Sequence, residues 1–141
     1  DLERHNQKLS AKYRAMQAAE QRSRTYRADD ARTLVIACNT PARMAKAAVE
    51  RLRREGLPVG LFQPISLWPF PIDALLPLLE HARELVVVEA SDGQLEDELR
   101  LALHHAGRAD VAITNLRHMG GILPVDREIY DAARRVTGSL S

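Results

Sequence analysis

Four short apolar runs, separated by helical patterns, recur at regular intervals along this chain. Residues 33–38 form a continuous apolar run, which is typical of a strand covered on both faces, and further strands are expected to begin at about residues 58, 84 and 109. The intervening helices are expected to end at Gly56 and near Gly107. Alternating strands and helices require right-handed crossovers and a mostly parallel sheet. The sequence therefore predicts a Rossmann-like three-layer α/β/α sandwich over residues 33–141.

The first 32 residues are different, because they are polar and basic. Apolar side chains fall at helical spacing on one thin stripe, which consists of Leu2, Leu9, Tyr13 and Met16. This pattern predicts one amphipathic helix over about residues 2–22, followed by an irregular connector to residue 32. A helix with so narrow an apolar stripe is not stable alone, so we expect it to pack either on the sandwich or on a neighbouring copy of the chain. The basic side chains have two interpretations. They belong either to an arm that binds RNA or a membrane, or to a helix face that is simply solvated.

Composition narrows the classes of function. Hydrophobic residues make up 45% of the chain and charged residues 28%, which suffices for one core. Twenty basic residues against nineteen acidic ones leave a net charge of +1, so we expect no nucleic-acid partner. The apolar runs are too short to cross a bilayer, so we expect no membrane partner. The one cysteine, Cys38, rules out an internal disulfide and a cysteine-based metal cluster, and it fits a cytoplasmic location.

The start of the chain carries no pattern of a signal peptide. The first residue is Asp1, and the sequence runs from there directly into a helical pattern. We therefore expect a fragment from the C-terminal side of a longer chain.

The most unusual segment covers residues 61–71. It reads LFQPISLWPFP and holds the only Trp, both Phe residues and three of the seven Pro. Proline stiffens a chain, and loops at the carboxyl edge of a parallel sheet are where such folds meet ligands or partners. Trp68 and Phe70 are therefore candidate interface residues. The alternative is that this loop packs Trp68 onto its own core.

Two other strand ends carry candidate site residues. At one, the amides around Gly93 and Gln94 suit either an anion or carbonyl ligand, or simple capping of the next helix. At the other, His118 is either a proton donor or an idle surface residue. Gly120 and Gly121 suggest a close approach of the backbone to another surface.

No catalytic or metal-binding residue can be assigned from the sequence. The loop after the first strand reads NTPA over residues 39–42 and lacks the GxGxxG of dinucleotide-binding folds. His104 and His105 lie at the end of a predicted helix, where no further metal ligands can be placed.

Several motifs together resemble the C-terminal domain of the alpha subunit of 2-oxoacid:ferredoxin oxidoreductases, of the 2-oxoglutarate and 2-oxoisovalerate types. Residues 59–71 read VGLFQPISLWPFP, where the family has a sequence like VGLFRPITLWPFP. Residues 37–43 read ACNTPAR and correspond to the family's AYGTxAR, which ends here at Arg43. Residues 116–124 read LRHMGGILP and correspond to its YGRxGGxxP. Asn39 stands where the family has Gly, and because Asn tolerates left-handed geometry we expect that turn to survive.

This resemblance implies a transketolase C-terminal-like fold and a role in a larger enzyme. That enzyme oxidatively decarboxylates a 2-oxoacid to an acyl-CoA and passes electrons to ferredoxin. Thiamine diphosphate with magnesium would lie between an upstream pyrimidine-binding domain and a beta subunit, and the beta subunit or a partner would supply an iron–sulfur cluster. This domain would hold no cofactor itself, because a cluster generally needs four thiolates.

The implied role of the domain is assembly and shaping of the approach to the active site, within a homo- or hetero-oligomer that binds coenzyme A. The candidate residues for that role are Asn39, Arg43, Trp68, Phe70, Gly93, Gln94, His118, Gly120 and Gly121. The alternative function is an independent Rossmann-type regulatory domain that binds a small ligand or nucleotide. It would need a phosphate-binding loop near Asn39 or Gly93, and the missing glycine fingerprint counts against it.

Overall fold

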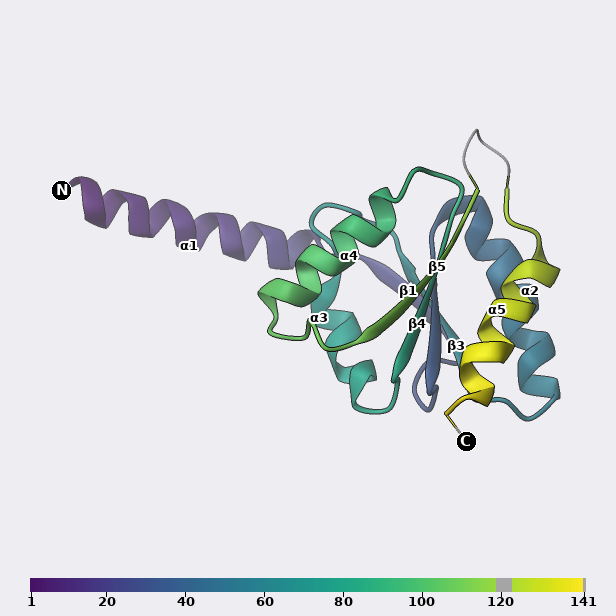
Figure 1. Cartoon of the computed structure of the whole chain (residues 1–141). Helices are drawn as coiled ribbons and strands as arrows, with labels where there is room; N and C mark the ends of the chain where they lie inside the picture. Colours follow the sequence, from purple (N-terminus) through teal and green to yellow (C-terminus); the bar gives the residue numbers. More distant parts are fainter. Residues whose placement is uncertain (119–122, 141) are drawn as a thin grey trace.

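A computed structural model describes residues 1–118 and 123–140 of the chain (Figure 1). Its helices and strands follow in the order α1 (Leu2–Glu20), β1 (Ser23–Tyr26), β2 (Thr33–Ala37), α2 (Asn39–Arg54), β3 (Val59–Pro64), α3 (Ile72–Leu75), η1 (Leu76–Glu80), β4 (Glu84–Glu89), α4 (Gln94–His105), β5 (Ala112–Arg117) and α5 (Asp126–Gly138). The four expected strands and the helices between them are all present. Gly56 and Gly107, which follow α2 and α4, have φ angles of +84° and +73°, as expected of glycines that end helices.

The five strands form one sheet in the order β1-β3-β2-β4-β5. Strands β2 to β5 are parallel, and Val35 of β2 is paired with Leu61 of β3 and Val86 of β4. All residues of β2 are buried, which explains its continuous apolar sequence. The predicted α/β fold with a mostly parallel sheet is confirmed.

Helices cover both faces of this sheet and give two cores (Figure 1). On one face, α2 and α5 pack against alternate residues of β2, such as Val35 and Ala37. On the other face, α3, η1 and α4 pack against Leu34 and Ile36. Because neighbouring residues of a strand point to opposite faces, both cores draw on the same strands.

The helical segment between β3 and β4 is short and divided. The structure has one turn of α-helix, α3, followed directly by the 3-10 helix η1, in which Pro77 lies near the start. Proline has no backbone N–H and clashes with the preceding turn, so it breaks a continuous α-helix.

The prediction of an irregular connector to residue 32 was wrong. Residues 23–26 form β1, which pairs antiparallel with β3 so that Arg24 lies opposite Gln63. Ala28 and Ala31 are buried in the core beneath. A four-residue strand gives almost no periodic signal when, as here, its side chains are exposed or only partly buried and their burial does not alternate. The division of the chain at residue 32 stays a prediction.

Helix α1 does not fold back on the sheet. It points away from the body of the chain, and all the side chains of residues 1–16 are exposed, including those of the apolar stripe (Figure 1). Packing on the chain's own sandwich, one of the two expected positions, is therefore wrong. Packing on a neighbouring copy stays a prediction.

Limited proteolysis with trypsin is expected to cut first within residues 4–14 and to leave a stable core that keeps β1 and Arg22, whose backbone is hydrogen-bonded to Ile65 and Ser66. The basic residues of α1 lie on an exposed helix, whereas β1 is hydrogen-bonded into the sheet. Mass spectrometry of the first fragments checks this result. First cuts after Arg24, Arg27 or Arg32 would contradict the pairing of β1 with β3.

Gly60 in β3 is required by a close approach of the chain to itself. A Cβ atom at this position would lie 2.5 Å from the carbonyl oxygen of Arg27 and 2.7 Å from the Cα of Ala28. Backbone atoms cannot move aside as a flexible side chain does, so Gly60→Ala is expected to lower the free energy of unfolding by about 1–3 kcal/mol. Chemical denaturation measures this loss. Gly138→Ala is the control, because a Cβ there meets nothing within 4 Å, and an equal loss in both variants would contradict the prediction.

Candidate functional site at the carboxyl edge of the sheet

The carboxyl ends of β2 and β4 lie side by side at the point where the chain changes direction. From β2 the chain crosses through α2 to β3 on one side, and from β4 it crosses through α4 to β5 on the other. The loops after the two strands therefore diverge, and in open α/β sheets this divergence is where ligands bind. A cavity of about 310 Å³ lies there, and both Asn39 and Gln94 line it.

Glu89, the last residue of β4, organises one wall of this cavity. Its side chain is buried, and its carboxylate accepts hydrogen bonds from the backbone N–H groups of Leu95 (2.7 Å) and Glu96 (3.2 Å). It also accepts from the hydroxyl of Ser91 (2.9 Å) and the side-chain amide of Asn115 (2.9 Å). A negative charge at a helix N-terminus is favoured by the helix dipole, so Glu89 ties α4 to β4 and β5.

This arrangement bears on the two interpretations of Gly93 and Gln94. Glu89 of the chain itself caps the N–H groups of Leu95 and Glu96 at the start of α4, which favours helix capping there, and the ligand role of the amides of Gly93 and Gln94 stays a prediction. Gly93 is buried with φ +95°, a conformation that glycine adopts without strain, and Gln94 is exposed at the cavity. Sequence reasoning did not identify Glu89, although an acidic residue that ends an apolar strand just before a helix was a usable signal.

Cys38, which directly follows β2, also lines this cavity. Burial raises the pKa of its thiol, and the nearby carboxylate of Glu89 raises it further. The thiol therefore stays protonated at neutral pH, which does not suit a nucleophile.

A second cavity, of about 490 Å³, adjoins the first and shares Asn39 and Thr40 with it. Arg43 of α2 lines this cavity together with Arg24 and Lys46. Asn39 has φ +57°, which confirms the left-handed turn expected at this position. The structure thus brings Asn39, Arg43 and Gln94 to one edge of the sheet.

Trp68 and Phe70 lie in different environments. The side chain of Trp68 is 72% exposed beside a groove of about 520 Å³ that Leu101 of α4 also lines. The alternative that Trp68 packs onto its own core is therefore wrong. Phe70 is 5% exposed and its ring stacks on Phe62, with 6.3 Å between the ring centroids. The interpretation of Phe70 as an interface residue is corrected, since two residues further along the loop the chain has returned to the core.

His118 follows β5 and is half-buried. Its Nε2 hydrogen-bonds the carboxylate of Glu128 on α5, and it is not among the residues that line the two cavities at this edge. Gly120 and Gly121 lie outside the described residues.

Two further properties concern the described part of the chain. No group of three His, Cys, Asp or Glu side chains comes close enough there to hold a metal ion. None of the helices described combines the length and the apolar character needed to cross a membrane.

Solved structures show the class of fold. The chain aligns with a 2-oxoglutarate:ferredoxin oxidoreductase from Magnetococcus marinus, solved with 2-oxoglutarate, coenzyme A and succinyl-CoA, at a TM-score of 0.69 and 19% identity over 82% of this chain and 20% of that one. It aligns with a split gene transketolase, an inactive beta4 tetramer, at a TM-score of 0.68 and 14% identity over 83% of this chain and 42% of that one. The transketolase C-terminal-like fold is confirmed.

The sequence profile of the pyruvate:ferredoxin oxidoreductase core domain II matches residues 31–129, and the chain belongs to this family. It is 37% identical over 141 residues to the ketoisovalerate oxidoreductase subunit VorB of Methanothermobacter thermautotrophicus. Over 103 residues, 73% of this chain, it is 34% identical to the 2-oxoglutarate synthase subunit KorA of Methanothermobacter marburgensis. The chain spans 39% of the length of the first relative and 26% of the second. The resemblance to 2-oxoacid:ferredoxin oxidoreductases is confirmed.

Proposed function

We propose that this chain is the C-terminal domain of the alpha subunit of a thiamine-diphosphate-dependent 2-oxoacid:ferredoxin oxidoreductase. Such an enzyme oxidises a 2-oxoacid in the presence of coenzyme A to an acyl-CoA and carbon dioxide, and transfers the electrons to ferredoxin. The observation that carries this proposal is the 37% identity with the VorB subunit over all 141 residues, α1 included.

The proposed role of the domain is assembly and shaping of the approach to the active site, not the chemistry itself. Two exposed features support it. The ring of Trp68 is 72% exposed, and aromatic residues are enriched at protein interfaces. The apolar stripe of α1 is exposed as well, including Leu2 at 75% and Tyr13 at 61%. The proposed partners are an upstream pyrimidine-binding domain and a beta subunit, in a cytoplasmic oligomer.

The test is to purify the full-length alpha subunit together with the beta subunit and to measure ferredoxin reduction. We expect co-purification, and reduction that requires both coenzyme A and a 2-oxoacid. A substrate panel of 2-oxoisovalerate and 2-oxoglutarate distinguishes the two types of relative. Failure of the subunits to associate, or reduction that does not depend on a 2-oxoacid, would contradict the proposal.

The isolated 141-residue chain is expected to bind no thiamine diphosphate. The coenzyme needs a magnesium ion held by several oxygen ligands, and the described residues bring together no such group. Calorimetry with thiamine diphosphate and magnesium measures the affinity, with the assembled enzyme as positive control. Micromolar binding to the isolated chain would contradict this prediction and would show that the domain itself binds the cofactor.

A further inference from the structure

The exposed apolar side chains of the described residues gather on two surfaces. Of nine large hydrophobic residues that are exposed, six belong either to helix α1 or to the groove beside Trp68. Those on α1 are Leu2, Leu9, Tyr13 and Met16, and those at the groove are Trp68 and Leu101. Exposed apolar surface that is concentrated in this way marks a site of interaction, whereas single scattered residues do not. Both surfaces are therefore expected to contact a partner.

The groove beside Trp68 combines apolar and acidic groups. It has a volume of about 520 Å³, and its larger apolar lining residues are Trp68, Phe70, Ile72, Leu76 and Leu101. The carboxylates of Asp73 and Glu98 also line it, together with the imidazole of His105, and none of its described lining residues is Lys or Arg. A helix that packs here should therefore present an apolar stripe with basic side chains beside it.

Helix α1 has this complementary pattern. Leu2, Leu9 and Met16 lie on one side of the helix, because a spacing of seven residues is close to two turns. Lys12 borders this stripe, since it lies three residues after Leu9 and four before Met16. His5 has the same position relative to Leu2 and Leu9, one heptad earlier. One border of the stripe thus carries the ammonium group of Lys12 and an imidazole, which suit the carboxylates of the groove.

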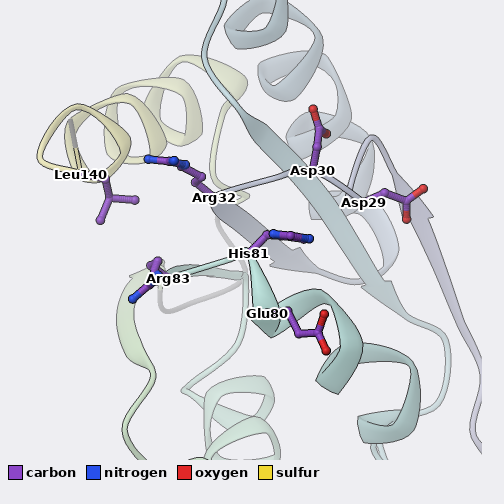
Figure 2. Close-up of a pocket in the computed structure, with 7 residues that line it drawn as sticks. All are labelled: Asp29, Asp30, Arg32, Glu80, His81, Arg83 and Leu140. Carbon is purple, nitrogen blue, oxygen red and sulfur yellow. The ribbon is translucent and has the colours of Figure 1, made fainter.

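The cavity at the amino edge of the sheet does not have this character. Its volume, about 590 Å³, is similar, but Leu140 is the one apolar residue among its described lining residues (Figure 2). The other six are ionisable, and acidic ones such as Glu80 lie among basic ones. The apolar stripe of α1 would bury little apolar surface there, so hydrophobic burial favours the groove beside Trp68.

The α1 helix of the same copy does not reach its own groove. Gln21 directly follows α1, lines the groove and hydrogen-bonds both the N–H and the carboxylate of Asp73. Arg22 is held by its backbone N–H, which donates to the hydroxyl of Ser66 (3.1 Å). From these two anchored residues α1 points away from the body of the chain (Figure 1). Its stripe could cover the groove only if the chain reversed its direction within the two residues between α1 and β1, so the occupant comes from another molecule.

We propose that α1 of a second copy of this chain lies in the groove beside Trp68, and that the groove of the second copy receives α1 of the first. Such an exchange has twofold symmetry, so every contact forms twice. The apolar stripe covers Trp68 and Leu101, and Lys12 lies against the carboxylates of Asp73 and Glu98. The exchange requires two copies, so it depends on concentration, and α1 of the dilute isolated chain stays exposed. It does not depend on the oxidoreductase role of the chain.

Photo-cross-linking between two copies of the full-length subunit, expressed together, tests this proposal. One copy carries p-benzoylphenylalanine in place of Tyr13, and the other carries an affinity tag. Irradiation, purification by the tag and peptide mass spectrometry then identify the partner of position 13. We expect a product that contains the tag and joins position 13 to residues 68–76 or 98–106. Cross-links only within one copy, to a part of the subunit outside residues 1–141, or to a beta subunit overturn the proposal.

Variants of the tagged copy show whether the groove itself is the site. Trp68→Ala is expected to lower the yield of the tagged product about tenfold, because a central aromatic anchor is lost. Glu98→Lys should lower it several-fold, and Lys12→Glu in the copy with the probe should restore most of that loss, because the two charges are then exchanged. Glu80→Lys is the matched control, since it makes the same change of charge at the amino edge of the sheet and should leave the yield unchanged (Figure 2). Equal yields with Glu98→Lys and Glu80→Lys, or no rescue by Lys12→Glu, overturn the proposal.

Discussion

Phe70→Ala is expected to lower the free energy of unfolding by about 3–5 kcal/mol, whereas Trp68→Ala is expected to leave it almost unchanged. The two aromatic residues are two positions apart in one loop, yet Phe70 is 5% exposed and Trp68 is 72% exposed. Removing the buried ring leaves a void beside Phe62, whereas removing the exposed ring creates none in this chain.

The two variants also differ in what they do to assembly. Thermal or chemical denaturation of the isolated chain gives the stability of each variant, and co-purification with the remaining subunits gives its assembly. If Trp68 contacts a partner, Trp68→Ala should lower the yield of the complex while the melting temperature of the isolated chain stays that of the parent. A large fall in melting temperature with intact assembly would contradict an interface role for Trp68.

Glu89→Ala is expected to lower the free energy of unfolding by about 2–4 kcal/mol. The substitution removes the acceptor of four hydrogen bonds and leaves the N–H of Leu95, which is buried, without its partner. It also removes the negative charge at the N-terminus of α4.

Glu89→Gln is the matched comparison, because it keeps the size of the side chain and one acceptor oxygen. We expect it to lose about half as much stability as Glu89→Ala, since its amide group replaces one acceptor by a donor. Denaturant titration of both variants measures the difference. Equal stability of Glu89→Ala and the parent chain would show that water replaces the carboxylate, and would contradict a structural role for Glu89.

The parallel part of the fold could be predicted from the sequence because three of its four strands, β2, β3 and β4, are almost fully buried on both faces. A strand such as β2 needs an uninterrupted apolar run, and Gly56 and Gly107 mark the ends of helices. Strand β1 could not be predicted from the sequence, because it is a partly exposed edge strand. The burial of its four side chains does not alternate. Its place in the sheet follows from pairing with β3, a tertiary contact that no local pattern encodes.

The candidate site was only partly predictable for a similar reason. Topology alone brings Asn39 and Gln94 to one edge, since both follow parallel strands. Whether an aromatic residue faces the core or the solvent depends on how a proline-rich loop turns, so Trp68 and Phe70 could not be separated. Arg24 and Arg43 line the same cavity only because β1 pairs with β3. Since the sequence did not predict β1, it did not predict this proximity either.

Helix α1 is attached to the body of the chain at its C-terminal end. Gln21, directly after the helix, accepts a hydrogen bond from the N–H of Asp73 (2.9 Å) and donates one to its carboxylate (3.2 Å). Nineteen helical residues extend about 28 Å, so a rotation of about 10° at Gln21 displaces the far end by about 5 Å. Gln21 and Asp73 both line the groove beside Trp68. A displacement of α1 would therefore act first on the two hydrogen bonds between Gln21 and Asp73, which lie at the groove beside the exposed Trp68.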